Sequence, residues 1–198
     1  MEQVFKPEDR IEIKINNNPK ATGFINDLNK SQYDILQNFK NKLLKNKIVE
    51  DFSVYDDLYL LRFLRARKFD IEKSYLMITD FFKWRKKENV DEADNYVYNE
   101  LFLVKKVYPH GYHKTDKLGR PIYIELIGES NIKELFKITN EDKMMRYFIR
   151  EYERLMRYRF PACSKAAGRI IEQGFTILEL NGVGMSLLSG KVRLIQFL

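Results

Sequence analysis

The sequence predicts an α/β protein in which a helical N-terminal layer precedes an α/β lobe. Apolar residues recur at three- and four-residue steps through residues 31–85, which is typical of amphipathic helices. Turn-forming Pro and Gly residues then cluster within residues 109–121, between two strand-like segments. A short apolar run follows at 174–180. The chain is therefore divided into a leader (1–30), a helical region (31–95) and an α/β region (96–198).

Composition narrows the class of protein. The chain has 198 residues, 44% of them hydrophobic, and a net charge of +7. Its single cysteine, Cys163, excludes an intramolecular disulfide framework and a zinc site built on two or more cysteines. No apolar run approaches the ~18 to 20 residues of a membrane span, and residues 1–30 lack the apolar middle of a secretory signal. We expect a cytosolic protein with affinity for anionic surfaces.

Each element follows from a local pattern. The leader alternates apolar residues only briefly and predicts at most one short strand. Three helices are expected next: one with a stripe from Ile35 to Ile48, one at 56–68 with aspartates in its first turn, and one after the N-cap Asp70, reaching residue 85. Residues 108–127 predict a hairpin. A long helix opens at Thr139 and is expected to break at Pro161.

The last elements are a buried strand at 174–180 and a helix beginning at Ser186. The chain stops on apolar residues in the middle of that helical pattern. We interpret this ending as an incomplete lobe.

Candidate catalytic groups are few. His110 and His113 are the two histidines, and an extended segment places them on opposite sides, so they cannot pair as metal ligands and are expected to form surface or turn hydrogen bonds. Cys163 has no partner base nearby and is expected to be a packed small residue. Gly182 and Gly184 indicate a turn rather than a phosphate loop. We therefore expect no catalytic site and no metal site.

The most basic stretch, residues 62–69, permits two interpretations. It can approach nucleic acid or lipid phosphates, or its cations can simply complement the C-terminal end of a helix dipole. The nearby aromatic residues fall on apolar helix faces rather than forming a stacking platform. We expect no nucleic-acid partner.

Tyrosines mark a possible ligand site. Tyr112, Tyr123 and Tyr152 fall on two adjacent strands and on the long helix that can cover them. Because tyrosine combines an apolar ring with a hydroxyl that seeks a partner when buried, this set is either ordinary core or the lining of a cavity for an amphiphile. Periodicity alone favours the core.

Four motifs, in order and with compatible spacing, closely resemble the CRAL-TRIO family, and in particular its Sec-fourteen type. They are Leu60-Leu-Arg-Phe-Leu-Arg-Ala-Arg-Lys-Phe-Asp, Trp84-Arg-Lys, Tyr112-His-Lys-Thr-Asp-Lys-Leu-Gly-Arg-Pro-Ile-Tyr and Tyr158-Arg-Phe-Pro-Ala-Cys-Ser-Lys-Ala-Ala-Gly. The resemblance implies a helical CRAL-TRIO N-terminal region followed by a lobe whose sheet floors a lipid pocket closed by a gate helix. It also implies that the lobe continues beyond this chain, so that the apolar faces of the strand at 175–180 and of the last helix are partly uncovered.

The resemblance also implies a site. The positions that match the family's choline-headgroup shell are Tyr112, Tyr123, Tyr152 and Thr176. Gly174 stands where the fungal-type pattern has a serine, which removes a hydroxyl donor. Arg67 matches a basic residue associated with the inositol-lipid site. No cofactor is implied other than the bound phospholipid.

The implied function is that of a monomeric carrier. It would enclose one phosphatidylinositol or phosphatidylcholine molecule and exchange it during transient contact with membranes, in the cytoplasm and peripherally at Golgi or endomembranes. Two alternatives stay open: a CRAL-TRIO module that holds another lipophile, such as a sterol-like or isoprenoid ligand, and a membrane-addressing regulatory module of a larger signalling protein.

Overall fold

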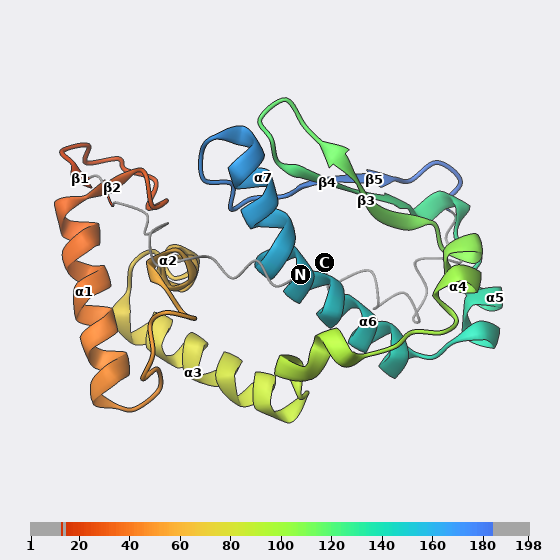
Figure 1. Cartoon of the computed structure of the whole chain (residues 1–198), viewed down its shortest axis with the longest axis horizontal. Helices are drawn as coiled ribbons and strands as arrows, with labels where there is room; N and C mark the ends of the chain where they lie inside the picture. Colours follow the sequence, from red (N-terminus) through yellow and green to blue (C-terminus); the bar gives the residue numbers. More distant parts are fainter. Residues whose placement is uncertain (1–12, 14, 184–198) are drawn as a thin grey trace. The chain divides into compact units, whose positions relative to one another are not determined.

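The computed structural model describes residue 13 and residues 15–183. The chain divides into two compact units, Met1–Glu88 and Asn89–Leu198, which we take in turn (Figure 1). The helix expected from Ser186 lies outside the described residues. The combination of helices with small sheets confirms the predicted α/β class.

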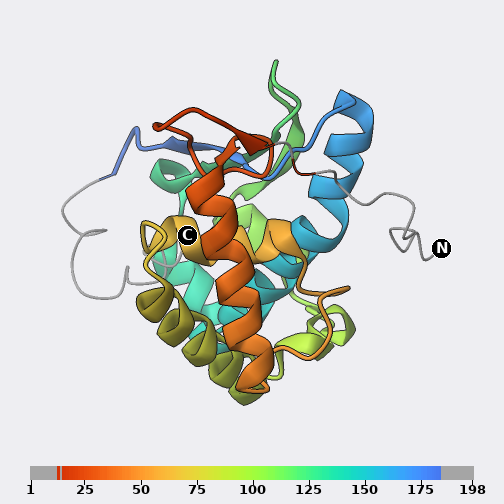
Figure 2. The ribbon, with the colours of Figure 1, turned by 90° about the vertical axis from the view of Figure 1, so that its left-hand side faces the viewer.

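The first unit contains the three predicted helices. Its elements are β1 (Ile15–Asn16), β2 (Leu28–Asn29), α1 (Lys30–Lys45), α2 (Asp57–Ala66) and α3 (Ile71–Lys87). Figure 2 looks onto α1. Each helix begins at a side-chain cap: Asn29 accepts from the amide of Gln32 in a capping box, Asp56 caps α2 and Asp70 caps α3. The predicted cap at Asp70 is therefore confirmed.

The core of this unit lies where the helical stripes meet. The side chains that the three helices bury most completely are Leu36, Phe39, Leu43, Leu60, Leu61, Leu64 and Ile78. Each such side chain contributes roughly 1.5–3 kcal/mol of transfer free energy, so the stripes account for the packing of the helices.

The prediction of at most one short strand in the leader is wrong. Two strands, β1 and β2, pair in parallel before α1. The carboxylate of Asp27 organises this segment, since it accepts from Asn16 Nδ2 (2.7 Å) and from the amide and hydroxyl of Thr22 (2.9 and 2.7 Å). Ile25 and Leu28 are buried beside it. Short polar loops with two apolar anchors give little periodicity, which explains the error.

One residue of the basic stretch 62–69, Arg65, has a structural role in the first unit. The guanidinium of Arg65 lies 4.0 Å from the centroid of the Phe24 ring, and its Nη1 donates to the carbonyl of Gly23 at 3.3 Å. Arg65 therefore ties α2 to the leader within the first unit. α2 ends at Ala66, two residues before the predicted end, and Lys68 and Phe69 follow with positive φ.

The second unit is built on a three-stranded sheet. Its elements are η2 (Val90–Asn95), α4 (Leu101–Val107), β3 (His110–Thr115), β4 (Pro121–Leu126), η3 (Ile127–Glu129), α5 (Ile132–Ile138), α6 (Glu141–Arg154), the π-helical turn η4 (Leu155–Arg159), α7 (Phe160–Ala167) and β5 (Phe175–Glu179). The strand order is β3-β4-β5, with β3 antiparallel and β5 parallel to β4. The predicted hairpin is confirmed, and a strand lies where one was predicted at 174–180. The prediction that this strand is buried is wrong, because β5 lies at the end of the strand order and four of its five residues are exposed.

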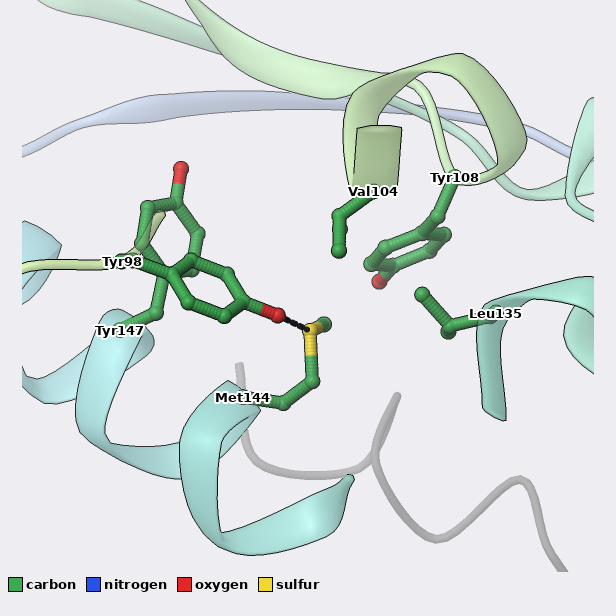
Figure 3. Close-up of a cluster of buried hydrophobic side chains, with 6 residues drawn as sticks. All are labelled: Tyr98, Val104, Tyr108, Leu135, Met144 and Tyr147. Carbon is green, nitrogen blue, oxygen red and sulfur yellow. Dashed lines mark hydrogen bonds between the residues drawn. The ribbon is translucent and has the colours of Figure 1, made fainter. Parts of the chain in front are cut away.

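Two short helices were not predicted. α4 and α5 pack against each other and against α6, and their inward side chains form a compact core (Figure 3). The buried members of that core are Tyr98, Val104, Tyr108, Leu135, Met144 and Tyr147. The Tyr98 hydroxyl donates to Thr139 Oγ1 at 2.7 Å, which satisfies a polar group that would otherwise be costly to bury.

The predicted break at Pro161 is wrong. The helix continues from α6 through η4 into α7, and the amide of Phe160 bonds to the carbonyl of Leu155, five residues earlier. This wider turn puts Pro161 in the first turn of α7, where its missing N–H does no damage. The chain leaves the helix at Gly168, which has a positive φ.

The outer strand β5 is largely uncovered, as predicted. Its apolar side chains that remain exposed are Phe175, Ile177, Leu178 and, just beyond the strand, Leu180. This confirms the expectation for the strand at 175–180; the corresponding expectation for the last helix falls outside the described residues.

A backbone contact next to the sheet gives a first prediction. A Cβ added to Gly128 would lie 1.6 Å from the carbonyl oxygen of Asn181, so the two segments can meet only at a glycine. Gly128→Ala should therefore destabilise the second unit by about 3 kcal/mol or more, beyond ordinary overpacking. Urea unfolding measures this, with Gly174→Ala as control, since its added Cβ would meet only Pro121 O at 3.7 Å. Equal midpoints for the two variants would contradict the close approach.

Candidate functional site: a tyrosine-lined sheet face

Three hydroxyl-bearing residues stand in one row across the sheet. Tyr112 on β3 is paired with Tyr123 on β4, and Tyr123 is paired with Thr176 on β5. Residues that are paired directly across strands project on the same side, so all three side chains belong to one face. We call them the hydroxyl row. The structure therefore brings together three of the six predicted site residues.

The two tyrosine rings of the hydroxyl row contact each other edge to face, with centroids 5.1 Å apart. Arg159 lies over the ring of Tyr112, with its guanidinium carbon 4.2 Å from the ring centroid. The guanidinium is fixed in turn by Glu151, whose carboxylate accepts from Nη2 at 2.7 Å. Burial raises the pKa of Tyr112 to about 12, so its hydroxyl stays protonated and available as a donor.

His110 is buried beside this row, on the same face of β3. Its ring lies among aromatic neighbours, with centroids 4.8 Å from Tyr108, 5.5 Å from Tyr147 and 5.7 Å from Phe148. Nδ1 donates to the carbonyl of Tyr108 (2.8 Å), which leaves Nε2 as acceptor of the Tyr147 hydroxyl (3.2 Å). Burial lowers the pKa of His110 to about 4. The expected surface or turn role is wrong for His110, whereas His113 is exposed.

A buried carboxyl group lies next to the row. Glu125 pairs with His110 across the hairpin and is fully buried. Its Oε1 accepts the hydroxyl of Tyr108. Burial raises the pKa of Glu125, because desolvation penalises the charged form more than the Tyr108 hydrogen bond stabilises it.

Two polar atoms on this face have no hydrogen-bond partner among the described residues. They are the hydroxyl of Tyr123 and Oε2 of Glu125, two positions apart on β4 and therefore on the same side of it. An unpaired buried polar group costs about 1–3 kcal/mol. Each of these atoms can form a hydrogen bond with a polar group of water or of a ligand.

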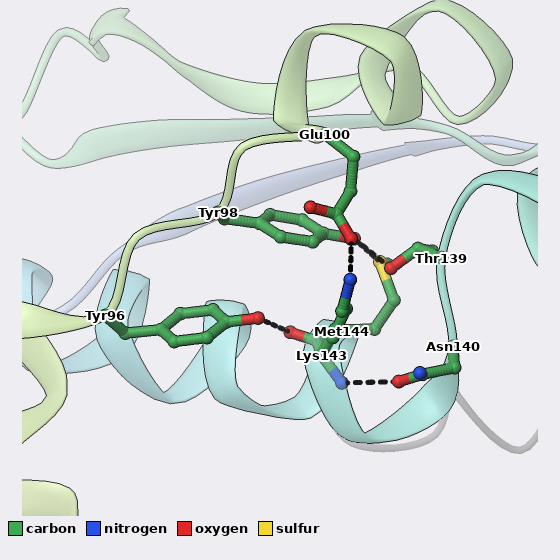
Figure 4. Close-up of polar contacts among 7 residues, drawn as sticks. All are labelled: Tyr96, Tyr98, Glu100, Thr139, Asn140, Lys143 and Met144. Atoms are coloured by element: carbon green, nitrogen blue, oxygen red, sulfur yellow. Dashed lines mark hydrogen bonds and ion pairs between the residues drawn. The ribbon is translucent and has the colours of Figure 1, made fainter.

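The helix that covers this face is α6, and its start is fixed by polar contacts around Lys143, which we call the polar brace (Figure 4). Lys143 Nζ pairs with Glu100 at 2.5 Å, and the amide of Lys143 donates to the N-cap Asn140 at 2.9 Å. Tyr96 donates to the carbonyl of Lys143 at 3.4 Å. The brace fixes the start of α6, the helix that places Tyr147 and Phe148 against His110.

The other three predicted residues are placed differently. Tyr152 lies on α6 with an exposed side chain, close enough to Tyr112 to affect its titration. Gly174 directly precedes β5, and its missing side chain would lie on the side of Thr176. Arg67 belongs to the first unit, where it is exposed at the end of α2. The assignment of all six residues to a lipid site stays a prediction.

Sequence reasoning missed the side chains that pack around the hydroxyl row, which are Tyr108, His110, Glu125, Tyr147, Glu151 and Arg159. The period-two pattern of β4 could have placed Glu125 beside Tyr123. The others come together through long-range packing, which leaves no local signal.

Other kinds of site are not found. In the part of the chain that the structure describes, no three His, Cys, Asp or Glu side chains group so that they could hold a metal ion. Of the described helices, none is both long and apolar enough to cross a bilayer. Burial raises the pKa of Cys163, which disfavours the reactive thiolate.

The chain is similar in sequence to known proteins. Residues 34–80 match the family described as the CRAL/TRIO, N-terminal domain. The chain is 49% identical over 132 residues to the SEC14 cytosolic factor of Kluyveromyces lactis, covering 66% of this chain and 44% of the relative. It is 44% identical over 171 residues to the Sec14 cytosolic factor of Schizosaccharomyces pombe, covering 85% and 59%.

A plant relative is also similar. The chain is 38% identical over 161 residues to the phosphatidylinositol/phosphatidylcholine transfer protein SFH7 of Arabidopsis thaliana, covering 80% of this chain and 29% of the relative. The chain thus spans less than two thirds of the length of each of these three relatives. Residues 34–80 thus form a CRAL/TRIO N-terminal domain, and the chain is similar to Sec14 cytosolic factors.

Proposed function

We propose that the protein binds one phospholipid molecule, phosphatidylinositol or phosphatidylcholine, at the hydroxyl row and exchanges it at membranes. The relatives named as phosphatidylinositol/phosphatidylcholine transfer proteins support this reading, as does the chemistry of the sheet face. We further propose that the protein acts in the cytosol, as its relatives' name of cytosolic factor suggests, as a monomer and without catalysis.

The physical task of such a protein is to remove acyl chains from water. About thirty methylenes at ~0.8 kcal/mol each would cost on the order of 24 kcal/mol to expose, so spontaneous exchange between bilayers is rare. An apolar protein surface replaces the water around the chains. Polar groups then select the head group, because a buried polar group without its partner is costly.

The observation that carries the proposal is the unpartnered hydroxyl of Tyr123 in the centre of the hydroxyl row. The head group of a phospholipid offers phosphate oxygens that accept hydrogen bonds from Tyr112, Tyr123 and Thr176. Transfer of labelled phosphatidylinositol and phosphatidylcholine between vesicles tests the proposal. Transfer no faster than that by an unrelated protein would argue against it.

Gly174 gives a prediction about head-group selectivity. An added Cβ at Gly174 would meet only the carbonyl of Pro121 at 3.7 Å, an ordinary contact, so a serine fits. Gly174→Ser should add a hydroxyl beside Thr176 and strengthen binding of phosphatidylcholine about tenfold, the effect of one good hydrogen bond. Gly174→Ala is the matched control without the hydroxyl. If both variants bind phosphatidylcholine like the unchanged protein, position 174 does not contact the head group.

A second candidate is carriage of a different lipophile, such as a sterol-like or isoprenoid molecule. Gly174 favours it, because the missing hydroxyl leaves one fewer donor for a phosphate. A membrane-addressing regulatory role in a larger signalling protein is the third possibility, and the same transfer assay distinguishes it, since such a module need not move lipid between vesicles.

A further inference from the structure

The outward side of α4 exposes two large apolar side chains that are adjacent in sequence. The inward side chains Val104 and Tyr108 are 0% and 3% exposed and fix the orientation of the helix. Phe102 and Leu103 consequently face outward and are 70% and 50% exposed. Two large apolar side chains that are exposed to water next to each other on one short helix indicate a surface that binds a partner.

Lysines flank these apolar residues. Lys105 and Lys106 are both exposed. Lys106 Nζ lies over the Phe102 ring at 4.4 Å from its centroid, whereas Lys105 extends along the side of α4 toward β3, where its Nζ would be 3.6 Å from a Cβ at Gly111. Neither lysine forms an ion pair with any described carboxylate. The sequence of α4 contains no acidic residue, and the preceding Glu100 is already paired with Lys143.

The adjacent helix extends the positive charge. α5, which packs against α4, carries Lys133 and Lys137 against a single acid, Glu134. Glu134 is paired with Lys137 at 2.6 Å, which leaves Lys133 to add to the charge of α4. The two helices therefore carry a net positive charge, and the ring of Phe102 is exposed beside Lys106.

From this arrangement we infer that the outward side of α4, residues 102, 103, 105 and 106, docks on the surface of an anionic phospholipid membrane. Phe and Leu on a helix with lysines beside them match the interfacial zone of a bilayer, where rings enter the acyl boundary and lysines reach the phosphates. A protein partner fits less well, because lysine is depleted from the centres of protein interfaces. This inference goes beyond the proposed lipid site, since it concerns where the protein meets the bilayer and not what it carries.

The test uses the full chain with two substitutions. Trp84→Phe removes the single native tryptophan, and Phe102→Trp introduces a fluorescent reporter at the proposed contact with the membrane. Vesicles contain brominated phosphatidylcholine with or without phosphatidylserine. We expect quenching of the reporter at position 102 that requires phosphatidylserine. Leu76→Trp in the same background is the control, because Leu76 is 62% exposed on α3 of the first unit. Absence of quenching at 102, or equal quenching at both positions, would overturn the inference.

Charge is tested separately. Lys105→Gln with Lys106→Gln should weaken binding to vesicles containing phosphatidylserine about thirtyfold, given ~1 kcal/mol per lysine at such a surface. Lys86→Gln with Lys87→Gln, an exposed pair on α3, is the control and should change binding little. An equal loss in both pairs would contradict a specific surface. Self-association that depends on Phe102, without quenching by vesicles, would also contradict it and indicate a second copy of the chain as the occupant.

The docking surface and the lipid site can fail independently. Lipid retained by the protein in native mass spectrometry, together with an unquenched reporter at position 102, refutes the docking surface alone. Quenching without any retained or transferred lipid refutes the proposed carrier function alone.

Discussion

Acidification from pH 7 to pH 4 is expected to destabilise the second unit by about 3 kcal/mol through His110 alone, because the pKa of its buried imidazole falls from 6.5 to about 4 on folding. The folded state holds the ring neutral between the Tyr108 carbonyl and the Tyr147 hydroxyl. The unfolded chain takes up the proton near pH 6.5 and the folded chain does not. This stability is therefore complete above pH 6.5 and is lost as the pH falls toward 4.

Urea unfolding at a series of pH values measures the effect. His110→Asn should remove about 3 kcal/mol of the pH dependence between pH 7 and 4, and His113→Asn, an exposed position on the same strand, should leave it unchanged. Trp84 lies in the first unit and reports on that unit separately through its fluorescence. Identical pH profiles for the two variants would show that His110 is not held neutral.

Glu125 acts in the opposite direction. Since burial raises its pKa, the folded state favours the protonated carboxyl, and this contribution is lost as the pH rises through the folded pKa. Both histidine variants keep Glu125, so comparing each variant with the unchanged protein at the same pH separates the contribution of His110 from that of Glu125. Acidification therefore weakens the contribution of His110 and strengthens that of Glu125.

Tyr123→Phe should separate lipid binding from stability. The Tyr123 hydroxyl has no partner among the described residues, so its removal should leave the lipid-free protein unchanged or stabilise it by about 1 kcal/mol. Lipid binding should weaken about tenfold, because the head group loses a donor in the centre of the hydroxyl row. Few core substitutions raise the stability of a protein while they weaken its binding of a ligand. This combination would indicate that the Tyr123 hydroxyl forms its hydrogen bond with the lipid and not with the protein.

Tyr147→Phe is the matched control for that experiment. It removes a hydroxyl that already bonds to His110 at 3.2 Å, so it should lower the free energy of unfolding by about 1 kcal/mol and leave lipid affinity unchanged. Thermal melting and a lipid-binding titration measure both quantities. A Tyr123→Phe variant that is destabilised and binds lipid normally would assign this hydroxyl to the core.

The helices of the first unit were predictable because their apolar stripes and caps are local. Asp56 and Asp70 were placed in helix starts by residue type, and both accept the expected amide. α4 was missed because Phe102 and Leu103 interrupt its inward stripe with outward apolar residues. That interruption is itself the basis for the proposed membrane contact.

The hydroxyl row was only partly predictable. The resemblance placed Tyr112, Tyr123 and Thr176 in one site, and strand register explains why they share a face. Burial of Glu125 and the stacking of Arg159 on Tyr112 depend on how η4 and α6 pack on the sheet, which no local pattern encodes. The helix through Pro161 was missed for a similar reason, since a π-helical turn has no sequence signature as simple as a cap.

Native mass spectrometry of the full chain, purified gently from cells, tests the central claim most directly. A single phospholipid bound per polypeptide is the result that we predict, with its mass lost from most of the population in Tyr123→Phe and kept in Tyr147→Phe. A spectrum that contains only the bare polypeptide, in preparations that also fail to extract phospholipid from vesicles, would contradict it.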